Sequence, residues 1–548
     1  MDNNVKKPSV AYFCMEYGLH EEFPLYAGGL GILAGDVLKT ARDQDLPLVG
    51  VGILWRQGYK KQEISESGRP YDCYPTNHYI YDYLEDTGIN VSVEIRDREV
   101  HCKVWRLGED RYGNAPLYLL DTNVPENAPS DQWLNGQLYG WFEEERIAQE
   151  MVLGIGGVKA LSELGLDPDI YHFNEGHAVF AALKLLRDEM DKGKKFPQAW
   201  EEIRKRIVFT THTPVEQGNE THGFKILDYM GLTDWLSTEQ LRSIGGDPFN
   251  MTAAGLKLSK VANGVSELHR ETAISMWEHV EDKAPIKGIT NGVHRGSWVD
   301  PRVEEIIERS SYGDIWPVHQ TLKRELIDFI EDRTGCKLGL EKLLIGFARR
   351  AAPYKRADLI FSRPDTIGPY LEKRDLQLVF SGKAHPLDER GKEIVSNLIS
   401  ASETYPESVV FLENYDMEIG RKLTRGVDVW LNNPRKPKEA SGTSGMKAAM
   451  NGVLNASILD GWWPEVCRDG ENGWQFGDGF EGEGQDEHDL EGLYEVLLEE
   501  IVPTYYQNRQ QWQEMMESSI RDTYERFSSK RMMEDYYERL YLLDKQSN

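Results

Sequence analysis

The sequence predicts an α/β protein with two doubly wound, Rossmann-like domains in tandem. The chain has 548 residues, and at about 100–200 residues per domain this length implies more than one domain. In both halves, short apolar runs alternate with amphipathic stretches, which is the pattern of strands and crossover helices in parallel sheets. Gly and Asn breakers lie between residues 289 and 298, so we expect one domain over residues 1–288 and another over 289–548.

Individual elements follow from the apolar runs. Strands are expected at the apolar runs 10–15, 48–55, 170–173, 207–211, 343–348, 376–380, 409–412 and 427–431. The valines of the last three runs favour strands further. Helices are expected over 32–42, over 178–187 and from about Lys355. The acidic, Gly-rich stretch 477–488 is expected to be a surface loop. The Tyr- and Met-rich segment 532–541 is expected to be helical and to dock back onto a domain.

Composition excludes several classes of function. Hydrophobic residues make up 40% of the chain and charged residues 28%, as in an ordinary globular protein. The formal net charge is −28, which disfavours general electrostatic binding to nucleic acid or anionic membranes. The five cysteines form no CxxC pair, the N-terminus has no secretory pattern, and no apolar run could span a bilayer. We therefore expect a cytoplasmic protein.

The first candidate site is the glycine-rich turn Tyr26-Ala-Gly-Gly-Leu-Gly-Ile-Leu-Ala34. Gly29, Gly31 and Ala34 fit a loose G-x-G-x-x-A spacing at a helix start, where backbone amides and the helix dipole favour an anion. A tight turn without a ligand is the alternative. A dinucleotide site is disfavoured, because Pro24 and polar residues separate the nearest strand from the glycines and the next strand lacks a ribose-binding acid.

The second candidate site is a run of cations directly after the expected strand at 343–348. Arg349, Arg350, Lys355 and Arg356 lie within eight residues of an otherwise strongly acidic chain. Arg presents a planar fork to a phosphate group and Lys presents a point charge. Their place at the carboxyl end of a strand indicates an anion site. A solvated basic turn is the alternative.

The third candidate site is the segment Lys438-Glu-Ala-Ser-Gly-Thr-Ser-Gly-Met-Lys447. Its small residues leave backbone amides accessible, and we expect Ser441 and Thr443 to cap the helix that follows. Lys447 then lies in an early helical turn, where the positive end of the helix dipole disfavours the charged amine. That placement suits Schiff-base chemistry. The alternatives are an anion bound beside the lysine and a solvated lysine in a Gly-rich loop.

The histidines offer weaker signals. His212 and His222 are ten residues apart, which is not a zinc-ligand spacing, and no third ligand is evident from the sequence. We therefore expect no metal site. His177, in Asn-Glu-Gly-His, is either a structural histidine or a catalytic one.

Together these segments resemble the α-glucan (glycogen, starch, maltodextrin) phosphorylases, in particular their short microbial type. Glu439-Ala-Ser-Gly-Thr-Ser-Gly-Met-Lys447 is similar to the pyridoxal-phosphate lysine motif of that family, Glu-Ala-Ser-Gly-Thr-Gly-Asn-Met-Lys. The resemblance extends from about residue 10 to residue 465. The other similar segments follow in the order of the family: Gly28-Gly-Leu-Gly31, Thr211-His-Thr213, Asn263-Gly264, Thr290-Asn-Gly292 with Trp298, and Arg350 with Lys355 around Tyr354.

The resemblance implies a GT-B fold, in which two Rossmann-like domains face each other across a cleft. It also implies reversible phosphorolysis, in which an α-1,4-glucan loses its non-reducing terminal glucose to inorganic phosphate. The product is α-D-glucose 1-phosphate with its anomeric configuration retained. The implied cofactor is pyridoxal 5′-phosphate, held on Lys447 as a Schiff base, whose 5′-phosphate is the proton-transfer partner of the substrate phosphate.

The resemblance further assigns roles by matching position. Lys447 carries the cofactor, and Arg350 and Lys355 bind the substrate phosphate. His212 faces the leaving-group side through its backbone carbonyl. The other residues on the cofactor side are Gly29, Arg349, Thr443, Trp298 and Tyr415. The residues that bind the sugar are Glu439, Ser441, Gly442 and Asn291, together with His212.

The sequence departs from the family pattern in three segments. Arg349 stands where the family commonly has Lys, Ser444-Gly445 replaces Gly-Asn, and Tyr415-Asp416 replaces the Tyr-Arg of many members. These changes alter the reach of one cation and remove one basic contact near the cofactor. The chain is also shorter than the animal enzymes and shows no counterpart of their N-terminal regulatory extension. We therefore expect no control by phosphorylation or AMP.

Two other classes of protein fit part of the pattern. A nucleotide-sugar glycosyltransferase of the glycogen or starch synthase kind shares the fold and an Arg/Lys pair, but it needs no cofactor-bearing lysine. A non-catalytic carbohydrate-binding protein could stack sugars on Trp55, Trp462 and Trp463, but it needs no cluster of cations. The sequence therefore favours the phosphorylase. Its expected partners are a glucan and inorganic phosphate, with no nucleic acid and no membrane, and a homodimer is one possible assembly.

Overall fold

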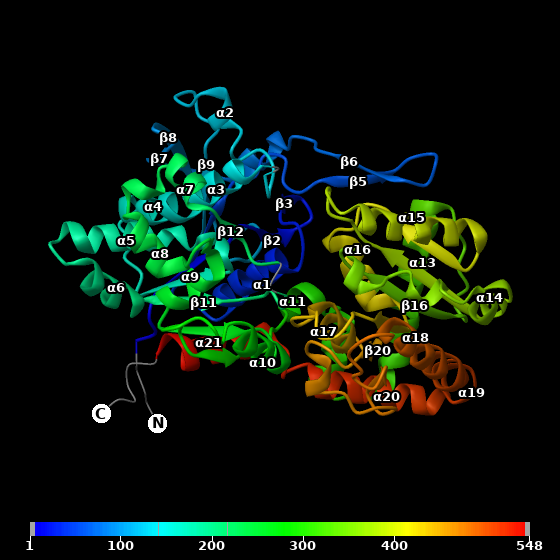
Figure 1. Ribbon diagram of the computed structural model, residues 1–548. Coiled ribbons are helices and arrows are strands. Elements are labelled where there is room, and N and C mark those ends of the chain that lie inside the picture. The colour runs from blue at the N-terminus through cyan, green and yellow to red at the C-terminus, as the bar shows by residue number, and fades with distance from the viewer. Residues whose placement is uncertain (1–5, 141, 216–217, 543–548) are drawn as a thin grey trace. The chain divides into compact units, whose positions relative to one another are not determined.

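The protein is described by a computed structural model that covers residues 6–140, 142–215 and 218–542. These residues form two compact units (Figure 1). The first unit comprises the chain up to Lys60, residues 74–290 and the segment from Met532, and the second comprises residues 61–73 and 291–531. Each unit is built around a mainly parallel sheet, so the α/β class predicted from the alternating pattern is confirmed.

The first unit contains a nine-stranded sheet. Across the sheet the strands are β15 (Ile286–Gly288), β14 (Val261–Gly264), β11 (Ile207–Thr210), β10 (Ile170–Asn174), β1 (Val10–Phe13), β4 (Leu48–Ile53), β9 (Leu117–Asp121), β8 (Arg98–Leu107) and β7 (Glu85–Ile95). All neighbours from β15 to β9 are parallel, and β8 and β7 continue the sheet as an antiparallel hairpin. The order of the strands reverses between β1 and β10, which makes that place a topological switch point.

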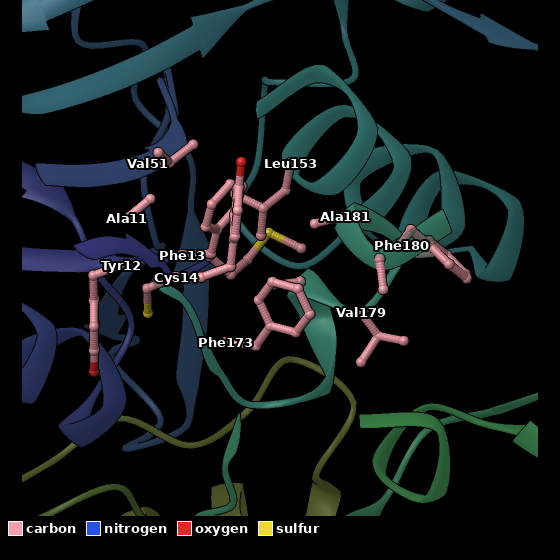
Figure 2. Packing of buried hydrophobic residues seen from close by; sticks show 14 of the residues in the cluster. Ala11, Tyr12, Phe13, Cys14, Val51, Leu153, Phe173, Val179, Phe180 and Ala181 are labelled. Carbon is pink, nitrogen blue, oxygen red and sulfur yellow. The ribbon is translucent and has the colours of Figure 1, made fainter. Parts of the chain in front are cut away.

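The core of the first unit surrounds these two strands. A parallel strand that is covered on both faces must be apolar throughout, and no residue of β1 is more than 1% exposed. The rings of Phe13 and Phe173 pack edge to face with centroids 6.0 Å apart. Figure 2 shows both rings beside the helical segments that carry Leu153 and Ala181. The packing therefore fixes the carboxyl ends of β1 and β10 against a rigid core.

The second unit contains a six-stranded, fully parallel sheet. Its strands are β18 (Val409–Leu412), β17 (Leu376–Ser381), β16 (Leu343–Ala348), β19 (Val429–Asn432), β20 (Leu454–Ile458) and β21 (Gly473–Phe476). The strand order reverses between β16 and β19, so this sheet also has one switch point. The hairpin of β5 (Lys61–Ile64) and β6 (Pro70–Cys73) packs on this unit, where the Gln62 amide donates to Asn414 Oδ1 at 2.9 Å.

The C-terminal segment packs into the first unit. Helix α21 (Ser529–Tyr536) continues as a π-helical turn, η11 (Tyr537–Tyr541), and its Met and Tyr side chains join the large apolar core of that unit. The Tyr541 hydroxyl lies 2.6 Å from His172 Nδ1, and Lys260 donates to the Tyr541 carbonyl. The segment is therefore held by polar contacts as well as by apolar burial.

Two sequence-based expectations were wrong. No helix begins at Lys355; 3₁₀ turns cover Pro353–Lys355 and Leu359–Phe361, and helix α14 covers Pro364–Glu372. The left-handed conformation of Arg356 (φ 52°) interrupts any continuous helix there, and Pro364 suits a first helical position. The loop expected over 477–488 ends early, because helix α18 (Gln485–Glu495) begins after Gly484. Among the described residues, no helix is both long and apolar enough to cross a membrane.

Close packing of helix α1 (Gly29–Asp43) on strand β2 (Tyr17–His20) generates a stability prediction. A Cβ atom on Gly35 would lie 2.0 Å from the Gly18 carbonyl oxygen, so the backbone must move to accommodate Gly35→Ala. Overpacking of this kind costs about 1–3 kcal/mol. We expect Gly35→Ala to lower the thermal unfolding temperature measured by circular dichroism. Gly223→Ala, whose Cβ meets no atom within 4 Å, is the matched control, and equal melting temperatures for the two variants would contradict the packing argument.

Candidate active site

The candidate site of the second unit lies at its switch point. Arg349 directly follows β16, and the chain that leaves β19 leads through residues 433–442 into helix α17 (Thr443–Met450). The carboxyl ends of β16 and β19 lie at the same edge of the sheet, and doubly wound proteins bind their ligands at that edge. The topology therefore brings together the basic run and the lysine segment, which are separated by about 90 residues in sequence.

A buried carboxylate between two cations is the centre of this site. Glu439 Oε2 accepts from Arg349 Nη2 at 2.6 Å and also from Lys355 Nζ. The three side chains are only 7–10% exposed. Burial alone would raise the pKa of Glu439, but the charges of Arg349 and Lys355 hold it below its ordinary value. Two cations on one carboxylate leave a net positive charge, which favours binding of a further anion.

The other two cations of the basic run are placed differently. Arg356 is buried and bonds to Asp489, Asp486 and the Asn433 carbonyl, so it holds the loops together. Arg350 is exposed, and within the described ranges its guanidinium takes part in no hydrogen bond or ion pair. The structure thus joins Arg349 and Lys355 to Glu439, and it leaves Arg350 in solvent.

Helix α17 begins without the expected side-chain caps. Gly442 occupies the N-cap in a left-handed conformation (φ 91°), and no side chain caps the helix. The prediction that Ser441 and Thr443 cap it was therefore wrong, because Ser441 lies before the N-cap and Thr443 is already the first helical residue. The Ser441 and Ser444 hydroxyls are buried and have no hydrogen-bond partner among the described residues. They are thus suited to bind a polar ligand.

Lys447 lies on the second turn of α17 with its amine against an aromatic ring. Its Nζ is 3.3 Å from the centroid of the Trp298 ring, and the residue is only 6% exposed. The side-chain amide of Asn451 donates to the backbone carbonyls of Lys447 and Trp298 at 2.8 and 3.0 Å. This amide ties the helix to the segment that carries Trp298, so the backbones that carry the amine and the ring are held together.

The loop after β20 supports the segment that carries Glu439 and Ser441, and no local sequence pattern pairs the two. Asp460 accepts from the backbone amides of Glu439 and Gly461 at 2.9 and 2.8 Å, and the Trp462 amide donates to the Ser441 carbonyl. Burial, reinforced by the charge of Glu439, raises the pKa of Asp460 to about 7. The available signal was an Asp-Gly pair directly after an apolar run, at a position where ligand-binding loops occur.

Packing accounts for one departure from the family motif. A Cβ atom on Gly445 would lie 2.6 Å from Asn455 Oδ1 and 3.0 Å from Trp462 Nε1. The side-chain amide of Asn455 also donates to the Gly445 carbonyl at 3.0 Å. Asn455 and Trp462 therefore fill the space that a larger side chain would need at position 445.

Two further predicted residues also lie in the second unit. Tyr415 is enclosed, and burial raises the pKa of its hydroxyl to about 12, so it remains protonated at neutral pH. Asn291 is 5% exposed, and its Oδ1 is buried without a partner in the described part of the chain. Its carbonyl accepts from Arg531 at 3.3 Å. Asn291 thus offers a fixed acceptor for a ligand.

In the first unit, the glycine-rich turn is already occupied in part by an internal anion. Glu16, just after β1, accepts from the amides of Ala27 and Gly28 at 2.6 and 3.1 Å. Burial raises the pKa of Glu16, and Tyr139 donates its hydroxyl to the other oxygen. Cβ atoms on Gly28 and Gly29 would meet no atom within 4 Å. The turn therefore keeps an open approach at Gly29, and no local sequence pattern indicates the carboxylate of Glu16 that binds it.

His212 lies after β11 and is held through its backbone. Its amide donates to Glu175 Oε1 at 2.5 Å, and its Nε2 lies 2.6 Å from Asn174 Oδ1. Glu175 has a φ of 74° and a ψ of 173°, a region that non-glycine residues occupy only under strain. Burial lowers the pKa of His212 to about 3, so its imidazole is neutral at physiological pH. If His212 acts on a substrate, it therefore acts through its backbone and not as an acid through its ring.

These features define an α/β protein with an anion site and a buried lysine at the switch point of a doubly wound sheet. A family model described as carbohydrate phosphorylase matches residues 301–495. The chain is 38% identical to the maltodextrin phosphorylase of Thermococcus litoralis, over 97% of this chain and 70% of that protein. It is 37% identical to the glycogen phosphorylase of Aquifex aeolicus, over 98% of this chain and 87% of that protein.

A glycogen phosphorylase of Mycobacterium tuberculosis is 34% identical over 97% of this chain and 70% of its own length. The chain belongs to the carbohydrate phosphorylase family. The resemblance inferred from the lysine motif and the segments around it is thereby confirmed.

The high pKa of Asp460 generates a prediction about stability and pH. The carboxyl stays protonated in the folded chain up to a pH of about 7, but it ionises in the unfolded chain near pH 4. Its contribution to stability is therefore complete below about pH 4 and is lost as the pH rises to about 7. We expect the free energy of unfolding of the wild type, relative to Asp460→Asn, to fall by up to about 4 kcal/mol over this range.

Urea denaturation of both proteins at a series of pH values measures this difference. The exposed Asp328→Asn is the matched control for the loss of one carboxyl group. A difference between the wild type and Asp460→Asn that does not change with pH would contradict the raised pKa of Asp460.

Proposed function

We propose that the protein catalyses reversible phosphorolysis of α-1,4-glucans, with release of α-D-glucose 1-phosphate and retention of the anomeric configuration. The observation that carries this proposal is the cluster of Arg349, Glu439 and Lys355 beside the segment that leads to Lys447. A net positive, enclosed site suits a phosphate dianion better than a neutral sugar alone. The maltodextrin and glycogen phosphorylases among the relatives support the choice of an α-glucan as the other substrate.

The residues present fit pyridoxal 5′-phosphate as the cofactor. A buried primary amine on Lys447 lies on the face of Trp298, and the hydroxyl of Ser444 is buried without a partner among the described residues. When bound, the cofactor would supply a second phosphate group as a proton donor and acceptor. Lys447 would hold it, and the remaining contacts would come from Trp298, Tyr415, Thr443, Arg349 and Gly29.

Different residues of the chain then bind the two substrates, phosphate and the glucan. Arg350 and Lys355 bind and orient the substrate phosphate, which protonates the departing glycosidic oxygen and attacks the same face of the sugar. The cations stabilise the negative charge that gathers there. On the sugar side we assign hydroxyl contacts to Glu439, Ser441, Gly442 and Asn291, and we assign the backbone carbonyl of His212 to the developing positive charge.

Several finer expectations stay predictions. These are the domain boundary at residues 288 and 289, the GT-B arrangement with a cleft between facing domains, the cytoplasmic location and the homodimer. They follow from the resemblance and from composition, and the proposed chemistry does not depend on the oligomeric state.

Production of glucose 1-phosphate from maltoheptaose and phosphate tests the proposed function. We expect activity from the wild type and loss of both activity and bound pyridoxal absorbance in Lys447→Ala, because only a primary amine can hold the cofactor. The exposed Lys373→Ala is the matched control and should keep both. An active Lys447→Ala protein, or a wild type that needs a sugar nucleotide instead of phosphate, would contradict the proposal.

The role of Arg350 is tested separately, because its side chain is exposed in the structure. A charge-assisted contact with phosphate contributes about 1.5–3 kcal/mol. We therefore expect Arg350→Ala to lower kcat/KM for phosphate at least about tenfold, with a smaller effect on the KM for maltoheptaose. Arg390→Ala, whose side chain is 73% exposed, is the control. An unchanged KM for phosphate would show that Arg350 does not bind it.

A further inference from the structure

A second cluster of ionisable side chains lies in the first unit, apart from the residues assigned above. Glu150 lies near the end of helix α3 (Glu143–Met151), and His222 belongs to the short strand β12 (Thr221–His222), which Glu220 precedes. One ligand atom from each of these three residues lies within 4.8 Å of the other two. The fold thus assembles three metal-type donors from segments about 70 residues apart in sequence.

The orientation of His222 points to a metal ion. Its Nδ1 lies 3.0 Å from Glu143 Oε1, so the N–H of the ring is directed to that carboxylate. Its Nε2 is then the free acceptor, is buried without a partner among the described residues, and lies 3.8 Å from Glu150 Oε2. Histidines that bind metals commonly donate their other nitrogen to a carboxylate in this way.

The carboxylates are also arranged as ligands rather than as a closed ion-pair network. Glu150 is fully buried, and neither of its oxygens has a hydrogen-bond partner in the described ranges. Glu220 Oε1 accepts from Arg146 at 2.8–2.9 Å, but its Oε2 is buried and unpartnered in the same ranges. Arg146 lies 3.4 Å from Glu150 as well, yet one guanidinium cannot neutralise two carboxylates. With both carboxyl groups ionised, this buried site carries one excess negative charge, which a bound cation would balance.

We propose that Glu150, Glu220 and His222 bind one Zn²⁺ ion, with Glu143 as the carboxylate that orients His222. One imidazole nitrogen and two carboxylate oxygens are donors that Zn²⁺ accepts at about 2.0–2.2 Å, and three protein ligands leave a fourth position for water. This proposal replaces the sequence-based expectation of no metal, which rested on His212 and His222 alone. It does not depend on the proposed phosphorolysis.

The proposed ion would connect helix α3 to strand β12, and the ligands bring with them Arg146, which also lies over the ring of Tyr139. A metal that binds only the folded chain raises the unfolding temperature in proportion to the logarithm of its concentration. Zinc binding is therefore measurable without any assay of activity.

The test is metal analysis of the full-length protein. The wild type is stripped with a chelator, dialysed against Zn²⁺ and then against zinc-free buffer, and its zinc is measured per chain by mass spectrometry. We expect about one Zn²⁺ per chain, with large losses in Glu150→Gln and His222→Gln. Competition with a chromogenic chelator should show that Glu143→Gln weakens the affinity about 10–100-fold. The neighbouring exposed Glu144→Gln is the matched control and should bind as the wild type does.

Circular dichroism shows whether each variant is folded, and Zn²⁺ should raise the melting temperature of the wild type but not that of His222→Gln. A folded wild type that retains no zinc would overturn the proposal. Equal zinc content in the wild type and in folded Glu150→Gln and His222→Gln variants would also overturn it, because the ion would then lie elsewhere.

Discussion

The contact of one buried carboxylate, Glu439, with Arg349 and Lys355 is the interaction on which the site of the second unit depends. Without an anion, two enclosed cations would repel each other and would each lose their hydration. Glu439 offsets part of that cost and leaves a net positive charge for a substrate anion. Asp460 in turn holds the backbone of Glu439, so the loops after β16, β19 and β20 converge on one charged centre.

Local sequence patterns predicted the central strands of both sheets: β1, β4, β10 and β11 in the first, and β16, β17, β18 and β19 in the second. They missed β7, β8, β9, β14, β15, β20 and β21. Continuous apolar runs mark parallel strands because both faces are covered, and the runs at 343–348 and 409–412 coincide with β16 and β18. The prediction of a helix from Lys355 was wrong because Arg356 adopts a left-handed conformation. An arginine in the sequence gives no indication of that conformation. The caps expected at Ser441 and Thr443 failed because the adjacent Gly442 takes the N-cap position itself.

The residues that local patterns missed are those brought in by distant segments. Glu16 accepts hydrogen bonds from the glycine-rich turn, and Asp460 accepts one from the backbone of Glu439. Glu150 lies close to His222 and belongs to a helix about 70 residues earlier in the chain. Each is a single acid with no distinctive spacing, so its partner becomes evident only when the sheet has placed both. Residue types that could bind a ligand were therefore predictable at the ends of strands. Which acid contacts which partner could be seen only in the folded structure.

The affinity for inorganic phosphate of two charge variants, measured by isothermal titration calorimetry, tests the central claim most directly. If Lys355 binds the substrate phosphate and Glu439 offsets the charges of Lys355 and Arg349, Lys355→Met should weaken phosphate binding at least about tenfold, and Glu439→Gln should strengthen it. Changes of opposite sign would establish that this cluster is the phosphate site. Unchanged affinity in both folded variants, or a change of the same sign in both, would contradict the account.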